Sequence, residues 1–220
     1  DSDQARNTGP DHALNNKNMG TGFLTTGSNK RSLTVDLKSE AGQKILTELA
    51  KEADVIVENY RAGALASLGL GYEDIKKINS GIIYCSLTAW GQDGPRGQQT
   101  AYDQVIQGYS GVMSITGNPE TGPLRCGPQL IDFGTGTTAA FSIASALFHR
   151  ERTGEGQHID GCLTDMAFVL MGAQITGAVR TGCKLGRFHQ PPTLRCWRSW
   201  STTVSQRRTR SACCTDPPAS

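Results

Sequence analysis

The stretch Asp54-Val-Ile-Val-Glu58 decides the fold, because its unbroken apolar centre is typical of a strand that a parallel sheet buries on both faces. Before it, the alternating residues 32–37 predict a first strand, and residues 39–53 predict an amphipathic helix that lies on a sheet. Ser39 is the expected N-cap of that helix. Strand, helix and strand in this order predict a right-handed crossover unit.

The same rhythm continues toward the C-terminus. A buried strand is predicted at residues 81–87 and a short one at residues 157–161. Helical spacing of apolar residues occurs at residues 64–68, 72–78, 102–112, 135–149 and 163–179. Strands that alternate with helices predict an α/β fold, a Rossmann-like layer of mostly parallel strands with helices on both faces.

The two ends of the chain lack this rhythm. Residues 1–30 read as an irregular surface segment rich in Asn, Gly, Asp and Thr. Residues 183–220 are aperiodic and basic, and they hold four of the seven cysteines. We interpret them as a non-native or disordered tail, with an interaction tail as the alternative. The predicted organisation is therefore a domain at residues 1–182 followed by this tail.

Charge and cysteine usage narrow the class of protein. Residues 183–220 hold seven basic residues and one acid, a net charge of +6, so residues 1–182 carry −4 of the total of +2. Residues 1–182 are mildly acidic and therefore lack the net positive charge that is typical of nucleic-acid-binding proteins. Three isolated cysteines suggest a reducing compartment, and neither a membrane-spanning run nor a signal peptide is recognisable. We expect a cytoplasmic protein with no nucleic-acid or membrane partner.

One carboxylate, Asp132 in the stretch 127–138 (GPQLIDFGTGTT), is the candidate functional residue. As a first possibility, it is the N-cap of the helix predicted at residues 135–149. As a second, Gly134 and Gly136 begin a Gly-x-Gly-x-x-Ala dinucleotide fingerprint beside it, although only two apolar residues precede Asp132.

The third possibility is that Asp132 is a nucleophile. A carboxylate can attack a thioester and expel a thiolate, and small residues such as Gly134 and Gly136 let a bulky acyl-CoA approach closely. N–H groups at the start of the helix can hold the carboxylate ionised. The local residues permit all three possibilities and require none of them.

Several longer blocks carry a resemblance to a known family. They look like successive segments of the family III CoA-transferases, which include formyl-CoA transferase and carnitine CoA-transferase, with α-methylacyl-CoA racemase as a relative: SNKRSLTVDLKSEAG (28–42), ADVIVENYRAGALASLGLGYEDIKKIN (53–79), IIYCSLTAWGQDGP (82–95), AYDQVIQGYSGVMSITG (101–117), LIDFGTG (130–136) and ERTGEGQHID (151–160). The resemblance spans about residues 1–180 and does not reach into the tail. It implies that residues 1–182 are part of the large domain, without the family's first strand, and that the full-length parent is an interlocked homodimer.

The resemblance also implies roles for individual residues. Asp132 corresponds to the family's catalytic aspartate, which takes the acyl group from a donor CoA thioester, passes through an aspartyl-CoA thioester and yields the CoA ester of an acceptor acid. Lys38 matches a lysine that contacts the CoA phosphates, and Asn59 and Tyr60 match a pair that lies along CoA. The expected substrates are an acyl-CoA and a carboxylic acid, with no permanently bound cofactor and no metal.

Departures from the family pattern bear on the reaction. Ala62 replaces a usual Pro, and Ser67 stands where several members carry a CoA-contacting basic residue. Tyr102 stands where the racemases have a His, just before the Asp that corresponds to Asp103, and a phenol is a poor acid/base group near neutral pH. Transfer is therefore favoured. The alternatives are a 2-methylacyl-CoA racemase-type enzyme and a truncated, non-catalytic CoA- or nucleotide-binding module.

The remaining candidates are of two kinds. The substrate-pocket candidates are Tyr102, Asp103, Gly134 and Gly136. His158 is interpreted as structural, and Asp165 is interpreted as a cap or an internal polar anchor.

Overall fold

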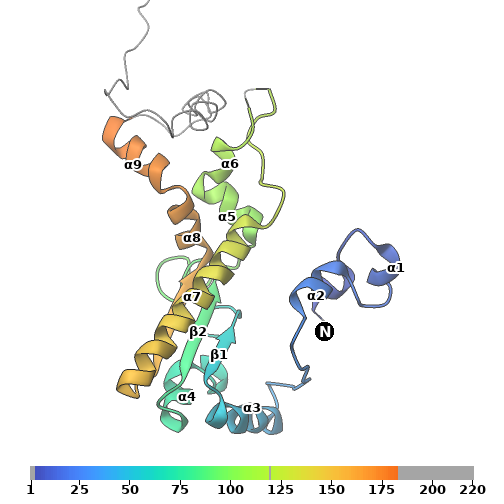
Figure 1. Ribbon diagram of the computed structural model, residues 1–220, viewed down its shortest axis with the longest axis vertical. Coiled ribbons are helices and arrows are strands. Elements are labelled where there is room, and N and C mark those ends of the chain that lie inside the picture. Colours follow the sequence, from blue (N-terminus) through green and yellow to red (C-terminus); the bar gives the residue numbers. More distant parts are fainter. Residues whose placement is uncertain (1–2, 119, 183–220) are drawn as a thin grey trace, which may run out of the picture. The chain divides into compact units, whose positions relative to one another are not determined.

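The computed structural model describes residues 3–118 and 120–182, so the predicted tail lies outside the described residues. The chain divides into two compact units, with the boundary between residues 46 and 47 (Figure 1). None of the described helices is long and apolar enough to cross a membrane.

The first unit contains short helices joined by turns. These are η1 (Gln4–Asn7), α1 (His12–Asn15), α2 (Thr21–Thr26) and the beginning of α3 (Glu40–Glu52). The carboxylates of Asp3 and Asp11 accept backbone N–H groups at the starts of η1 and α1. Helices of at most six residues leave too few turns for an apolar period to appear, which explains why residues 1–30 show none.

The strand predicted at residues 32–37 is wrong. This segment has no regular secondary structure, and the side chain of Leu33 is 63 % exposed. A strand needs a neighbour to accept its backbone hydrogen bonds, and among the described residues no strand pairs with this segment. An alternating pattern without a pairing partner therefore stays irregular.

Helix α3 confirms its predicted cap. The N–H of Gly42 donates to the hydroxyl oxygen of Ser39 at 3.0 Å, and that hydroxyl donates to the carbonyl of Asp36. The predicted apolar face of α3 is only partly buried, because Ile45 and Leu49 are 46 % and 52 % exposed.

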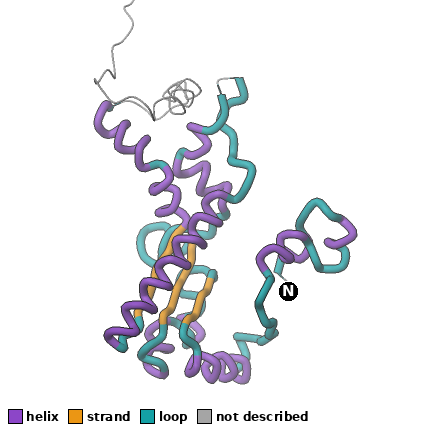
Figure 2. Tube along the Cα trace, in the orientation of Figure 1, coloured by secondary structure: helices purple, strands orange, loops and turns teal. Residues whose placement is uncertain are grey.

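Three parallel strands form the sheet of the second unit (Figure 2). They are β1 (Val55–Glu58), β2 (Ile83–Thr88) and β3 (Gln157–Cys162), in the order β1-β2-β3. Ile83 stands opposite Val55 on one side and Gln157 on the other. All three strands lie where the sequence predicts them, within two residues.

Helices cover both faces of this sheet. On one face, Tyr72 at the start of α4 (Tyr72–Ile78) stacks on His158 of β3, with the ring centroids 5.1 Å apart. Tyr84 of β2 points to the same face and meets both rings edge-on. Ile83 and Cys85 face the other way, because side chains alternate along a strand, and α7 packs against β2 and β3. The predicted α/β layering is confirmed.

Helix α7 (Leu130–Thr153) is the longest of the described elements, and it starts five residues before the predicted helix. It ends at Gly154 in the left-handed conformation, as the Gly-rich sequence there predicts. Near this end, the guanidinium of Arg150 lies 2.7 Å from the carboxylate of Asp54 and also donates to the carbonyl of Gly81. The last turns of α7 are thus tied to the beginning of the sheet.

A small apolar core lies beyond the other end of the sheet. It consists of Ala89, Ile106, Ile131 and Ala167, with Trp90, Ala101, Leu163 and Met166 packed against it. It joins the first turn of α7 to α5 (Asp103–Ser110) and α8 (Leu163–Leu170). The remaining elements are η2 (Ala66–Leu68), α6 (Val112–Ile115) and α9 (Gly172–Thr181).

The helix predicted over residues 102–112 corresponds to α5, whereas the helix predicted over residues 163–179 is broken into two. Gly111, with φ of +90°, ends α5 before α6 begins. The helix predicted over residues 163–179 is interrupted at Met171, which separates α8 from α9. The break at Met171 falls in an apolar stretch whose composition alone predicts a continuous helix.

Candidate active site

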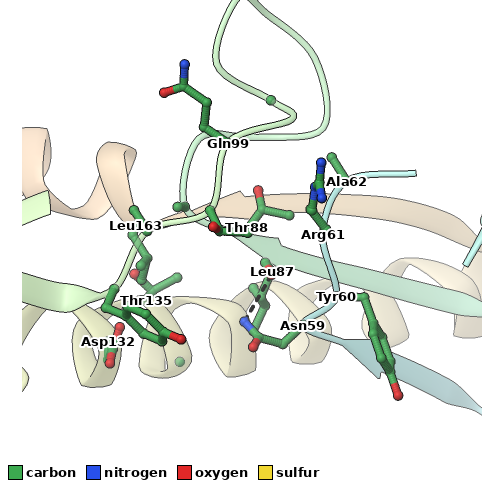
Figure 3. Close-up of a pocket in the computed structure, with 16 residues that line it drawn as sticks. Asn59, Tyr60, Arg61, Ala62, Leu87, Thr88, Gln99, Asp132, Thr135 and Leu163 are labelled. Atoms are coloured by element: carbon green, nitrogen blue, oxygen red, sulfur yellow. Dashed lines mark hydrogen bonds between the residues drawn. The ribbon is translucent and has the colours of Figure 1, made fainter. Parts of the chain in front are cut away.

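A pocket of about 440 Å³ opens at the carboxyl ends of the parallel strands (Figure 3). Ligands of open parallel α/β sheets bind at this edge, because the connecting loops and helix N-termini converge there. All of the lining residues belong to the second unit: Asn59, Tyr60, Arg61, Ala62, Leu87, Thr88, Ala89, Gly97, Gln99, Thr100, Ala101, Tyr102, Asp132, Thr135, Gly136 and Leu163.

Asp132 is the carboxylate of this pocket. It is the third residue of α7, so the prediction that it is the N-cap of this helix is wrong. Its side chain is exposed, and no hydrogen bond or ion pair joins its carboxylate to another residue in the described part of the chain. Its pKa is raised, first by partial desolvation and then by the negative charge of Asp103.

Asp103 supplies the missing cap. One oxygen of its carboxylate accepts the backbone N–H of Ile131 at 2.8 Å and that of Asp132 at 3.2 Å. Its other oxygen accepts the side-chain N–H of Gln107. Asp103 is only 2 % exposed and does not line the pocket, so its prediction as a substrate-pocket residue is wrong. A carboxylate with this many donors is a buried structural group.

Gly134 and Gly136 lie inside α7, in the turn that follows Asp132. A dinucleotide fingerprint needs these glycines in a loop between a strand and a helix, so the dinucleotide prediction is wrong. A Cβ on Gly134 would lie 2.8 Å from the terminal methyl of Met166, so this glycine allows α8 to pack closely and is not a pocket residue. Gly136 does line the pocket, and a Cβ there would meet nothing within 4 Å.

The residues after β1 form the opposite wall. The side-chain N–H of Asn59 donates to the carbonyl of Leu87 at 3.1 Å, the bond drawn in Figure 3, so its orientation is fixed and its amide oxygen remains to accept a hydrogen bond. Tyr60 is 53 % exposed, and its ring turns away from Asp132 in Figure 3. Asn59 and Tyr60 therefore line the same pocket as Asp132, and their predicted contacts with CoA stay a prediction.

Tyr102 also reaches the pocket. It is the N-cap residue of α5 and is 68 % exposed, so its phenol is accessible to a ligand. Among the described residues that line this pocket, Asp132 is the only carboxylate and no histidine is present.

Lys38 lies outside the unit that forms this pocket. Lys38 belongs to the first unit, in the turn before α3, where its backbone N–H donates to the carboxylate of Asp36. Its predicted contact with CoA phosphates stays a prediction. Ser67 is exposed, and its hydroxyl donates to the carbonyl of Ala64 within the same turn.

Sequence reasoning missed Thr135 and the loop at residues 97–101, which form much of the lining. Thr135 is 5 % exposed, and its hydroxyl donates to the carbonyl of Ile131 one turn earlier. Residues three and four positions apart share a helix face, so a helix known to start at Leu130 would have placed Thr135 and Gly136 beside Asp132. The signal was present, but the predicted helix began too late to use it.

Other candidate groups have contacts that account for them. His158 lies 2.9 Å from the hydroxyl of Ser86 and stacks on Tyr72, on the face of the sheet away from α7. Asp165 lies in the first turn of α8, where its backbone N–H donates to the sulfur of Cys162. Burial raises the pKa of Cys162 to about 11 and also raises that of the Cys85 thiol, so neither forms a thiolate readily near neutral pH.

The parallel sheet and the carboxylate-bearing pocket at its carboxyl ends define the class: an α/β protein with a ligand pocket where the strands end. The family model for CoA-transferase family III matches residues 1–196. The chain belongs to this family, and the resemblance seen in its sequence blocks is confirmed.

Individual relatives agree. The succinate–glutarate CoA-transferase of Agrobacterium fabrum is 39 % identical over 170 residues, which cover 76 % of this chain and 42 % of the relative. The acetyl-CoA:oxalate CoA-transferase of Acetobacter aceti is 37 % identical over 193 residues, covering 85 % and 48 %. A crystal structure of a CAIB/BAIF family protein from Brucella suis matches with a TM-score of 0.69 and 40 % identity, over 72 % of this chain and 42 % of that one. The chain thus spans less than half the length of these relatives.

Proposed function

We propose that the full-length protein moves CoA from an acyl-CoA donor to a carboxylic acid acceptor, with Asp132 as the nucleophile. The observation that carries this proposal is the state of Asp132, an accessible carboxylate without a hydrogen-bonding partner among the described residues, in a pocket at the carboxyl ends of the strands. Three curated relatives are named for CoA transfer between small acids, which supports the same class of substrates.

In this reaction Asp132 is the only protein residue that forms a covalent bond to the substrate, and every step balances. A carboxylate oxygen of Asp132 attacks the thioester carbonyl carbon, the C–S bond breaks, and CoA leaves as the thiolate. The thiolate attacks the side-chain carbonyl carbon of Asp132 in the mixed anhydride, which releases the donor acid and leaves an aspartyl-CoA thioester. The acceptor carboxylate then attacks the side-chain carbonyl carbon of this thioester, which expels the CoA thiolate and forms a second mixed anhydride. The thiolate attacks the acceptor's acyl carbon in that anhydride, which yields the acceptor's CoA ester and restores the carboxylate of Asp132.

The environment of Asp132 suits this role. A carboxylate whose pKa is raised is more basic, and thus more nucleophilic, than an ordinary aspartate while it is still ionised. Gly136 leaves open space one turn further along the same helix face, where a thioester can approach.

We assign binding of CoA to the wall that faces Asp132. Asn59 offers its amide oxygen to an N–H of the pantetheine arm, and the ring of Tyr60 gives that arm an apolar surface. Lys38 is proposed as a partner of the CoA phosphates, because its side chain is cationic and exposed. The pocket volume of about 440 Å³ lies within the usual range for organic ligands, roughly 300–1,000 Å³.

Racemisation at the 2-position is the alternative that the pocket disfavours. It needs two acid/base groups beside the same Cα, and the described lining offers one carboxylate and the phenol of Tyr102, without a histidine. Uptake of deuterium from solvent at Cα, without an acceptor acid, is the result that would favour racemisation.

We further propose that the full-length protein is a homodimer in the cytoplasm and that it works without a permanently bound cofactor. The support for the dimer is family membership. The three described cysteines are free thiols, which fits a reducing compartment.

Trapping of the intermediate tests the proposal directly. The full-length protein is incubated with succinyl-CoA or acetyl-CoA and quenched with hydroxylamine, and the modified peptide is mapped by mass spectrometry. A hydroxamate on Asp132 supports the proposal, and the Asp132→Asn variant serves as the unlabelled control. Turnover with a label on another residue, or with none, would falsify it.

A further inference from the structure

Helix α7 is capped from a distant part of the chain. Its N-cap residue, Gln129, makes no side-chain cap, although the first N–H groups of a helix have no partner within the helix. The carboxylate of Asp103 takes the N–H groups of Ile131 and Asp132 instead, from a position 28 and 29 residues earlier in the sequence.

Asp103 is itself held from a second side. Its other oxygen accepts from the side chain of Gln107, which is 0 % exposed. The amide oxygen of Gln107 in turn accepts the N–H of Cys126 at 2.7 Å. One buried carboxylate therefore fixes three segments to one another: the first turn of α5, the loop before α7, and the first turn of α7.

This arrangement decides what the carboxylate of Asp132 is free to do. A carboxylate at the third position of a helix commonly folds back to accept a free N–H at the helix start. Because Asp103 already accepts the N–H groups of Ile131 and Asp132, Asp132 is not needed to cap them, and its side chain lines the pocket.

We propose that Asp103 is a positioning residue for the transfer reaction: it holds the first turn of α7 so that Asp132 presents both carboxylate oxygens to the thioester, and it places a buried carboxylate beside that nucleophile. This inference rests on the proposed function. It replaces the pocket role predicted from the sequence, because Asp103 acts through Asp132 and does not contact the substrate itself.

The charge of Asp103 can be separated from its shape. A neutral side chain of the same size still accepts a backbone N–H, but only a charged one changes the protonation of its neighbour, and the charge of Asp103 contributes to the raised pKa of Asp132. The other ionisable groups at the pocket are Tyr60, Arg61 and Tyr102. The neighbouring helix α8 brings Asp165, which interacts with the Cys162 thiol.

The experiment compares Asp103→Asn with Asp103→Glu in the full-length protein. The rate of hydroxamate formation on Asp132 is measured in a single turnover from pH 3 to pH 8. Asp132 must be ionised to attack, so the rate falls below its pKa. Loss of the neighbouring charge lowers that pKa, so the acid limb of the pH–rate profile, where the rate falls, should move to lower pH in Asp103→Asn. The rate at the plateau should also fall about tenfold or more, because Asp132 is then less basic and less firmly held. Asp103→Glu keeps the charge and should keep the acid limb.

A control variant separates positioning from loss of stability. Arg150→Ala removes the ion pair with Asp54 at the far end of α7, and should lower stability without moving the acid limb. If Asp103→Asn does not fold, Asp103→Ser, with a smaller neutral acceptor, replaces it in the same measurement.

The outcomes distinguish the two proposals. Labelling of Asp132 in the wild type together with an unmoved acid limb in the neutral variant overturns the role of Asp103 and leaves the proposed function intact. A wild-type protein that turns over without a label on Asp132 overturns the proposed function, and this inference with it. A shifted limb in Asp103→Asn, with Asp103→Glu and Arg150→Ala unshifted, supports the positioning role.

Discussion

The first turns of α5 and α7 each carry an aspartate, and the two residues are used in opposite ways. Asp103 is 2 % exposed and accepts three N–H groups, whereas the carboxylate of Asp132 is exposed and accepts none from the described residues. The residue type and the position near a helix start do not distinguish them. What distinguishes them is hydrogen-bond satisfaction: a satisfied carboxylate stabilises the fold, and an unsatisfied one at a pocket is available for chemistry.

The largest effect is expected at Asp132. Asp132→Asn should reduce CoA transfer about 10⁴-fold or more, the scale of loss when an enzyme loses its nucleophile. The free energy of unfolding should change by less than about 0.5 kcal/mol, because no contact of the carboxylate is lost. Steady-state transfer rates and urea unfolding of the same preparation check both parts. A variant that keeps a tenth of the activity contradicts the assignment.

At Asp103, in contrast, we expect a large loss of stability. Asp103→Ala leaves two backbone N–H groups of α7 and the side chain of Gln107 without their acceptor in a buried site, and should lower the free energy of unfolding by about 2–4 kcal/mol. Urea unfolding followed by circular dichroism measures this loss. If Asp103→Ala and Asp132→Asn unfold at the same urea concentration, the contrast between the two carboxylates is removed.

A pair of glycines in α7 sharpens the comparison. Ala in place of Gly gains about 1 kcal/mol of helix propensity at either site. In Gly134→Ala the new Cβ lies 2.8 Å from the terminal methyl of Met166, whereas in Gly136→Ala it meets nothing within 4 Å. Gly136→Ala should therefore be the more stable variant by about 1–3 kcal/mol. It should also raise the KM for acyl-CoA, because its methyl group enters the pocket. Equal stabilities would show that α8 does not pack on Gly134 as described.

The smallest expected effect is a pH-dependent change in stability. The pKa of Asp132 is raised in the folded state, so ionisation of this residue favours the unfolded state as the pH rises. Relative to the wild type, Asp132→Asn should gain a little stability above the folded pKa, and the difference should vanish below pH 3.8, the pKa of an ordinary aspartate. Denaturation midpoints at pH 3 and pH 7 test the sign, and a loss of stability at pH 7 contradicts it.

Much of the fold could be predicted because its signals are local. The apolar run at Val55–Val57 and the helical spacing of Tyr72–Ile78 need no information from elsewhere in the chain. The strand predicted at residues 32–37 is wrong because a strand needs a neighbouring strand to pair with, and an alternating pattern does not show whether one is present. The start of α7 was predicted too late for a related reason. The cap of this helix comes from Asp103, and the residues next to Leu130 carry no capping signal.

The site was predictable only in part. Residues 127–138 alone left Asp132 as a cap, a neighbour of a dinucleotide loop or a nucleophile, and the resemblance of longer blocks favoured the last. Gly134 was misplaced because its close neighbour, Met166, lies on another helix. Asp103 was placed in the pocket because sequence order does not show which residues are buried.

The distant cap of α7 has a consequence for exchange of backbone hydrogens with solvent. Amides in the first turn of a helix usually exchange quickly, because they have no partner within the helix. Here the amides of Ile131 and Asp132 donate to a buried carboxylate and can exchange only when α5 and α7 separate. Native-state exchange followed by NMR should find these two amides about as slow as those of β2, although they lie next to the accessible carboxylate of Asp132.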